Sequence, residues 1–286
     1  MRTPVFPKLL TMFLMLLLFS FEGRSQSETF STGSFIINMG ATNPGTIANS
    51  IKPYGLIYDL IRNYKVPVKF IVNTSKAKDG VDFTYNADQY KGGTFIIKSE
   101  YRTTAVNSRI TYWVGQGVVG TTTTSAITLN VTRTINLYPH WTLDVQNGAI
   151  AEKFLLNAGI NNTSFPGAYN WKTPAQLNGC DDFFVLPHAD PTWATHGALW
   201  SWNKNYLGCI WSGCHAVSVL ENLSNPANPA QKMNFLTSTG LVPFGAHGDG
   251  SPPYTHILSN RVCWVLMGIR GRTIPVCSKW NQAGGG

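Results

Sequence analysis

The stretch that decides the fold class is residues 180–223, CDDFFVLPHADPTWATHGALWSWNKNYLGCIWSGCHAVSVLENL. It holds two short apolar runs, Phe183–Leu186 and Leu207–Trp211, and a turn that contains a histidine closes each run. A helix-like pattern follows each turn, over about 195–206 after the first run and from residue 216 after the second. Strand, helix, strand and helix in this order are typical of a parallel sheet whose strands are joined by crossover helices.

An earlier part of the chain shows the same alternation. Residues 34–39 (SFIINM) have the pattern of a buried strand, residues 54–64 (YGLIYDLIRNY) that of a helix, and residues 66–72 (VPVKFIV) that of a second strand. The four aliphatic residues of the helix fall on one of its faces, namely Leu56, Ile57, Leu60 and Ile61. A second strand–helix–strand unit is therefore expected near the N-terminus.

These two units predict an α/β fold, a mostly parallel sheet flanked by helices, over residues 26–245. Residues 82–134 are rich in Thr, Val and Ile, and they are expected to form a β-rich insertion in that domain. Residues 246–286 are rich in Gly and Pro, which favours a loop-rich C-terminal extension.

The N-terminus has the organisation of a cleaved signal peptide. Arg2 and Lys8 form a basic region, residues 9–21 are almost wholly apolar, and Gly23 and Ser25 are small residues at the expected cleavage site. The apolar run is shorter than the roughly 20 residues that a membrane-spanning helix needs. We therefore predict a signal peptide over residues 1–25, a secreted or cell-surface protein, and no transmembrane segment after the signal is removed.

Charge and composition exclude one class of partner. Hydrophobic residues make up 43% of the chain and charged residues 13%, so the chain can bury a sizeable core. The formal net charge is +8, yet the Lys and Arg residues are scattered singly. Nucleic-acid binding requires clustered basic residues, so no nucleic-acid partner is expected.

The chain has five cysteines, Cys180, Cys209, Cys214, Cys263 and Cys277. Export permits disulfide bonds, and the odd number leaves at least one thiol without a partner in the chain. The cysteine spacings do not match a zinc site, so neither a metal nor a cofactor is expected. Cys263 and Cys277 flank a turn and could close a hairpin, whereas Cys214 could be a nucleophile, a disulfide half or a buried apolar residue.

Cys214-His215 is the first candidate for chemistry. The pair closes an expected strand and opens an expected helix, and Gly213 before it permits a tight turn. Nucleophiles of parallel α/β proteins collect at such turns, where helix N–H groups favour negative charge. The second candidate pair is His247 and Asp249, which follow an expected strand in a Gly-rich loop.

Other polar and aromatic residues of the central stretch suggest binding. His188 and Asp190 close the first apolar run, at the edge of the sheet where Cys214 is expected. Trp200 and Trp202 lie in the helical pattern and Trp211 ends the second apolar run, so they are either core residues or a platform for sugars or peptides. Carbohydrate or other surface components are the partners that these residues suggest.

The turn Ser212-Gly213-Cys214-His215-Ala216 resembles that of the class I glutamine amidotransferase-like superfamily, and most of all its DJ-1/PfpI branch. In that branch the nucleophilic cysteine is followed directly by histidine, and then by glycine where this chain has Ala216. The resemblance implies a flavodoxin-like fold and a nucleophilic role for Cys214. It also implies a base role for His247 with Asp249 as its orienter, and His215 is the alternative base.

A second resemblance concerns the N-terminal half. Residues 35–40, 54–61 and 90–97 are similar to phrases in uncharacterised modules near the N-terminus of large bacterial secreted surface proteins. This resemblance implies export and carries no activity. The expected function is therefore a secreted or cell-surface binding or structural module, and the alternative is a secreted cysteine-dependent hydrolase or amidotransferase-like enzyme that uses Cys214 as nucleophile.

Overall fold

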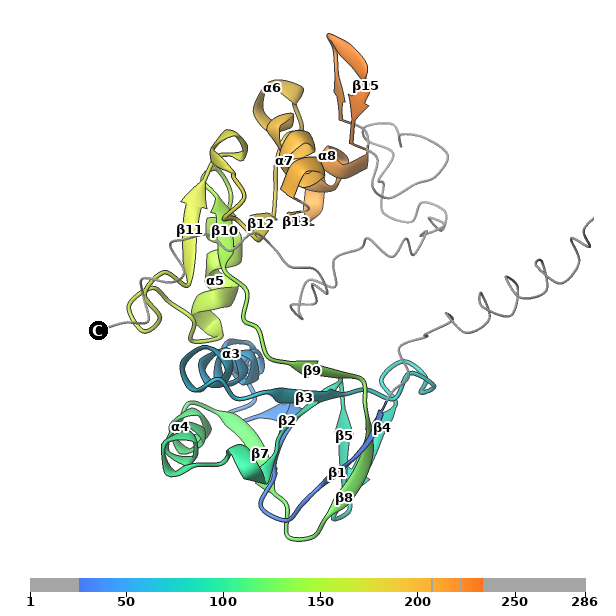
Figure 1. Cartoon of the computed structure of the whole chain (residues 1–286), viewed down its shortest axis with the longest axis vertical. Helices are drawn as coiled ribbons and strands as arrows, with labels where there is room; N and C mark the ends of the chain where they lie inside the picture. Colours follow the sequence, from blue (N-terminus) through green and yellow to red (C-terminus); the bar gives the residue numbers. More distant parts are fainter. Residues whose placement is uncertain (1–25, 207, 222, 234–286) are drawn as a thin grey trace, which may run out of the picture.

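The computed structural model describes residues 26–233 except 207 and 222, and within that range it contains two sheet systems joined by a helix layer (Figure 1). The N-terminal half runs in the order β1 (Gln26–Phe30), β2 (Phe35–Thr42), α2 (Ile47–Ser50), α3 (Lys52–Tyr64), β3 (Val68–Ile71), β4 (Val81–Tyr85), β5 (Asp88–Lys91), β6 (Thr94–Ile97), α4 (Thr104–Gly115), β7 (Val118–Thr122), β8 (Ile127–Val131) and β9 (Arg133–Ile135).

The C-terminal half follows with four strands of four residues each, their connecting helices and a short hairpin. Its elements are β10 (Trp141–Asp144), α5 (Ala149–Asn157), β11 (Tyr169–Lys172), β12 (Phe183–Leu186), α6 (Trp193–His196), α7 (Ala198–Tyr206), β13 (Cys209–Ser212), α8 (Val217–Glu221), β14 (Ser224–Asn225) and β15 (Asn228–Lys232).

The prediction of a mostly parallel sheet flanked by helices is wrong. A five-stranded sheet in the order β7-β2-β6-β3-β9 is antiparallel throughout, as are the small sheets β1-β8, β4-β5 and β14-β15. Among the sheets of the described residues, only β11-β10-β12-β13 is parallel.

The prediction of a parallel sheet fails because of the position of β6. The expected strand–helix–strand unit exists as β2, α3 and β3, and both strands run antiparallel to β6, so they point in the same direction. They do not pair, however, because β6 lies between them. Residues 82–134 are therefore not an insertion beside a parallel sheet, since β6, β7 and β9 are part of the same sheet as β2 and β3.

The antiparallel sheet is buried on both faces. Alternate residues of β2 point to opposite sides, so Phe35 and Ile37 pack into one cluster with α3 and α4, whereas Ile36 packs into another with residues of β1, β5 and β8. The face of α3 that the sequence predicted is confirmed, because Leu56, Ile57, Leu60 and Ile61 are all buried.

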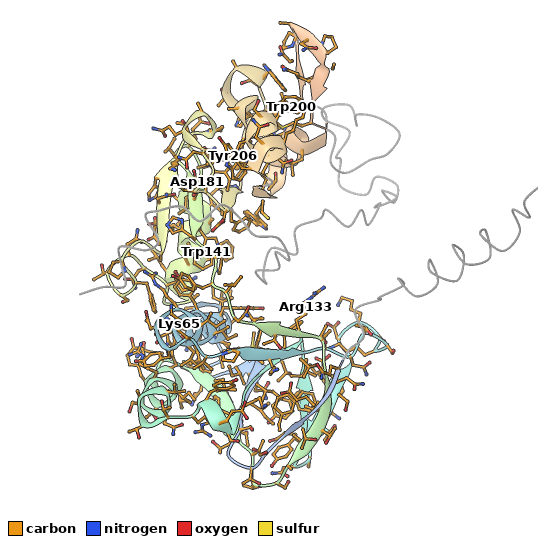
Figure 2. All side chains as sticks on the ribbon, in the orientation of Figure 1. Lys65, Arg133, Trp141, Asp181, Trp200 and Tyr206 are labelled. Carbon is orange, nitrogen blue, oxygen red and sulfur yellow. The ribbon has the colours of Figure 1, made fainter. Side chains whose placement is uncertain are left out.

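The parallel sheet is covered on both faces as well. Phe183 and Val185 of β12 join the same core cluster as α3, and Phe184 and Leu186 pack against residues of α7 and α8. Helix α3 thus contributes to a core that both halves share. The ring of Tyr58 lies 5.1 Å from that of Trp141, which Figure 2 places between the two halves.

Candidate functional site

The carboxyl edge of the parallel sheet is the place where the fold gathers reactive side chains. Strand β10 continues through α5 to β11 on one side, and β12 continues through α6 and α7 to β13 on the other (Figure 1). The connections of two neighbouring strands, β10 and β12, therefore leave in opposite directions. In open parallel sheets, ligands bind at the carboxyl ends of the strands at such a point.

Cys214 lies at this edge, directly after β13. It is an exposed, free cysteine with a backbone φ of 47°. The turn that presents it is held at both ends, since Gly213 N–H donates to Leu186 O and Ala216 N–H donates to Gly213 O. A left-handed conformation at a non-glycine residue costs roughly 1–2 kcal/mol, so the surrounding turn must impose it.

The described cysteines are of two kinds, disulfide-bonded and free. Cys180 and Cys209 are disulfide-bonded, and Cys214 is the free cysteine of the described part of the chain. Cys263 and Cys277 lie outside the described residues, and so does any hairpin that they close. The thiol of Cys214 is therefore available for reaction where two other sulfurs are not.

His215, which follows Cys214 in the sequence, faces the carboxylate of Asp190. Its Nδ1 lies 3.7 Å from Oδ1 of Asp190, and its ring is stacked at 6.3 Å on that of His188. The structure thus brings together three of the polar residues singled out in the sequence. No hydrogen bond joins Cys214 Sγ to any residue of 26–233 outside the gaps at 207 and 222.

His247 and Asp249, the predicted base and orienter, lie outside the described residues. Their proposed roles stay predictions. The same holds for the loop-rich extension over 246–286.

Two residues that the sequence reading missed also lie near this edge. Asp144 ends β10 and is 1% exposed, with its Oδ2 accepting from Asn147 N–H at 3.1 Å. His196 of α6 is 2% exposed, its Nδ1 contacts the Thr192 backbone, and its Nε2 has no hydrogen-bond partner among the described residues. The signal available in the sequence was an acidic residue, Asp144, directly after the apolar Leu143.

Burial shifts both groups toward their neutral forms. It raises the pKa of the Asp144 carboxyl above its ordinary value, against the backbone N–H groups of Asn147 and Gln146. It lowers the pKa of the His196 imidazole, although the Thr192 backbone and the charge of Asp144 act in the opposite direction. A buried carboxyl and a buried imidazole with a free nitrogen are the groups from which acid–base chemistry is built.

The lowered pKa of His196 predicts a pH dependence of stability. Between the lowered pKa and the ordinary value of 6.5, the unfolded chain binds more protons than the folded one, so the free energy of unfolding rises with pH across that window. Replacing His196 with asparagine, which keeps an acceptor for Thr192 N–H, should flatten this rise.

Urea unfolding at about pH 5.5 and about pH 7 measures the effect. A residual rise is expected in the variant, because burial also lowers the pKa of His140. The same slope in the variant and the wild type would contradict the assignment.

The tryptophans do not form one binding platform. Trp202 is 3% exposed and its Nε1–H donates to Asn178 O at 2.9 Å, whereas Trp200 lies on another side of α7 with Lys204 over its ring. Figure 2 shows Trp200 and Tyr206 at separate places along this helix. Trp202 is therefore a core residue, and Trp211 is exposed on β13.

Within the described residues, no group of three or more His, Cys, Asp or Glu side chains has an arrangement that could hold a metal ion. In that range no helix is both long and apolar enough to cross a membrane. A comparison of the chain with protein-family models, curated proteins and solved structures finds no match.

Proposed function

We propose that the carboxyl edge of the parallel sheet is a cysteine-dependent acyl-transfer site with Cys214 as its nucleophile. The observation that carries the proposal is the conformation of Cys214, which is free, exposed and left-handed in the turn between β13 and α8. Strained backbone at a reactive residue is common in active sites, and a strand–nucleophile–helix turn is one recurrent form of it.

The chemistry is the formation and hydrolysis of a thioester. The Cys214 thiolate attacks the carbonyl carbon of an amide or ester, the bond to the leaving amine or alcohol breaks, and the leaving group takes up a proton. Water then attacks the thioester, releases the acid and restores the thiol. His215 is the nearest candidate in sequence for the proton transfers, with Asp190 orienting its ring through Nδ1.

His247 and Asp249 are the alternative base and orienter in this proposal. Their spacing, and the Cys214-His215 pair, carry the likeness to the amidotransferase-like superfamily that motivates it. Export through the signal peptide of residues 1–25 belongs to the same proposal, and it places the site outside the cell.

A second candidate function is a non-catalytic surface module that binds carbohydrate or other surface components. It is favoured by one observation, namely that no residue of the described part hydrogen-bonds to Cys214 Sγ. In this case the left-handed turn is only a structural feature, and the recognition surfaces lie elsewhere.

Alkylation and acylation separate the two candidates. In a native, non-reduced sample at about pH 6.5, iodoacetamide should label Cys214 at least about tenfold faster than it labels free cysteine. With p-nitrophenyl acetate, mass spectrometry of tryptic peptides should find one acetyl group on Cys214. Cys180 and Cys209 serve as internal controls, since disulfide-bonded sulfurs do not react.

Cys214→Ser should abolish the labelling, and His215→Asn should slow it if His215 is the base. Unchanged labelling in His215→Asn, together with slower labelling in His247→Asn, would assign the base to His247. Labelling of Cys214 no faster than free cysteine, with no acetylation, would contradict the enzyme and leave the binding module.

A further inference from the structure

A cleft lies between α3, α4 and residues 159–165, in the part of the molecule away from β13 (Figure 1). Its volume is about 370 Å³, which is within the range of small-molecule sites. Its walls come from both halves of the chain, because Asp59, Arg109 and Tyr112 belong to the N-terminal half and Ser164 and Phe165 to the C-terminal half. It shares no residue with the site around Cys214.

The cleft has a rigid polar floor. Asp59 is fully buried, and its Oδ2 accepts from Arg109 Nε at 2.7 Å, Arg109 Nη2 at 2.6 Å and Trp113 Nε1 at 2.8 Å. Its Oδ1 accepts from Asn63 Nδ2 at 2.8 Å. Four donors on one carboxylate hold the surrounding side chains in a single geometry.

The floor is also neutral. Of the described residues that line the cleft, only Asp59 and Arg109 are charged, and they neutralise each other in a paired geometry. A charged ligand would therefore gain little from this pair, whereas a neutral polar ligand meets fixed dipoles. Lys52 Nζ lies nearby, 3.7 Å from the position that a Cβ on Gly159 would take, so charge needs its own test.

Several polar groups of the cleft keep hydrogen-bonding capacity. Asn63 Oδ1, Arg109 Nη1, Ser164 Oγ and Tyr112 Oη have no hydrogen-bond partner among the described residues, although Asn63 and Arg109 are held in place through their other nitrogens. They include donors, an acceptor and hydroxyls that are both. Such a mixture suits the hydroxyl groups of a neutral sugar, which donate and accept from the same atoms.

An aromatic ring stands at the same cleft. Tyr112 is 48% exposed, and Arg109 Cζ lies 4.4 Å from its ring centroid. Trp113 packs edge-on at 5.6 Å. The ring is thus oriented by its neighbours while part of it faces solvent, and an aromatic surface of this kind packs on the apolar C–H face of a sugar.

We infer that this cleft binds the ring of a neutral sugar, with Tyr112 packing on the sugar and Asn63, Arg109 and Ser164 as its hydrogen-bond partners. The inference does not depend on a reactive Cys214. It assigns a ligand class to a site between α3, α4 and residues 159–165, where the sequence analysis placed no functional residue.

Saturation-transfer NMR on the full chain tests the inference, with glucose, galactose, mannose, N-acetylglucosamine and glucuronic acid as separate probes. At least one neutral sugar should bind with a Kd of roughly 1–10 mM. Tyr112→Ala should weaken that binding by about tenfold or more. Tyr206→Ala is the matched control, because Tyr206 is also 48% exposed but lies on α7, and it should leave the affinity unchanged.

A second measurement does not depend on a variant. The indole N–H resonance of Trp113, which bonds to Asp59 in the floor, should shift on addition of the bound sugar. No response to any neutral sugar at roughly 50 mM, binding of glucuronic acid alone, or equal weakening by Tyr206→Ala would overturn the inference. Each outcome is independent of the alkylation of Cys214, so the two proposals can fail separately.

Discussion

Replacing Asp59 with alanine is expected to lower the free energy of unfolding by about 3 kcal/mol. The Asp59 carboxylate is fully buried and accepts hydrogen bonds from Arg109, Trp113 and Asn63. Its removal leaves the indole N–H of Trp113, which is 2% exposed, without an acceptor. It also leaves the Arg109 guanidinium unpaired. The Arg109 side chain is 31% exposed, so water can solvate the unpaired guanidinium. The expected loss of stability is therefore at the low end for a broken buried ion pair.

Urea unfolding of two further variants tests this reason. Asp59→Asn should lose less than Asp59→Ala, because an amide oxygen still accepts from Trp113. Glu100→Ala also removes a paired carboxylate, but its side chain is 55% exposed beside Lys98, so a change within about 0.5 kcal/mol is expected. Equal losses for Asp59→Ala and Glu100→Ala would contradict the role of burial.

Replacing Gly55 with alanine should also destabilise the protein, by about 2 kcal/mol, although helix propensity alone predicts the opposite. Gly55 lies inside α3, where alanine is favoured over glycine by about 1 kcal/mol. A Cβ at this position would, however, lie 1.9 Å from Ala158 O and 2.5 Å from the Trp113 ring. The backbone of residue 158 cannot yield without opening the contact between the two halves, so the clash outweighs the propensity.

Gly115 provides the matched control for this prediction. It is the last residue of α4, and a Cβ there would meet no atom within 4 Å. Gly115→Ala should therefore be neutral or stabilising by up to about 1 kcal/mol. Urea unfolding measures the change in the free energy of unfolding of each variant. An increase for Gly55→Ala would contradict the close approach of α3 to Ala158.

The alternation in the sequence determined which residues face the core. In α3, Leu56, Ile57, Leu60 and Ile61 are buried as their spacing predicted. In β8, Ile127, Leu129 and Val131 lie on the more buried side, while Thr128 and Asn130 are exposed. Periodicity predicts faces because the geometry of a helix or strand is local, and it also located the turn between β13 and α8 where Cys214 is found.

Only the tertiary structure decided which strands are neighbours. The pattern of β2, α3 and β3 is the same whether the two strands pair or, as here, enclose β6, because the next strand in the sheet is chosen by packing between distant segments. The same reason applies to the sites. Asp59 and Arg109 are fifty residues apart in the sequence. The charge of Asp144 acts on the pKa of His196, although the two residues follow different strands of the parallel sheet. Neither pair has a sequence spacing that would reveal the contact. The sequence alone located the strand-to-helix turn that carries Cys214, and the fold decided which groups surround that turn.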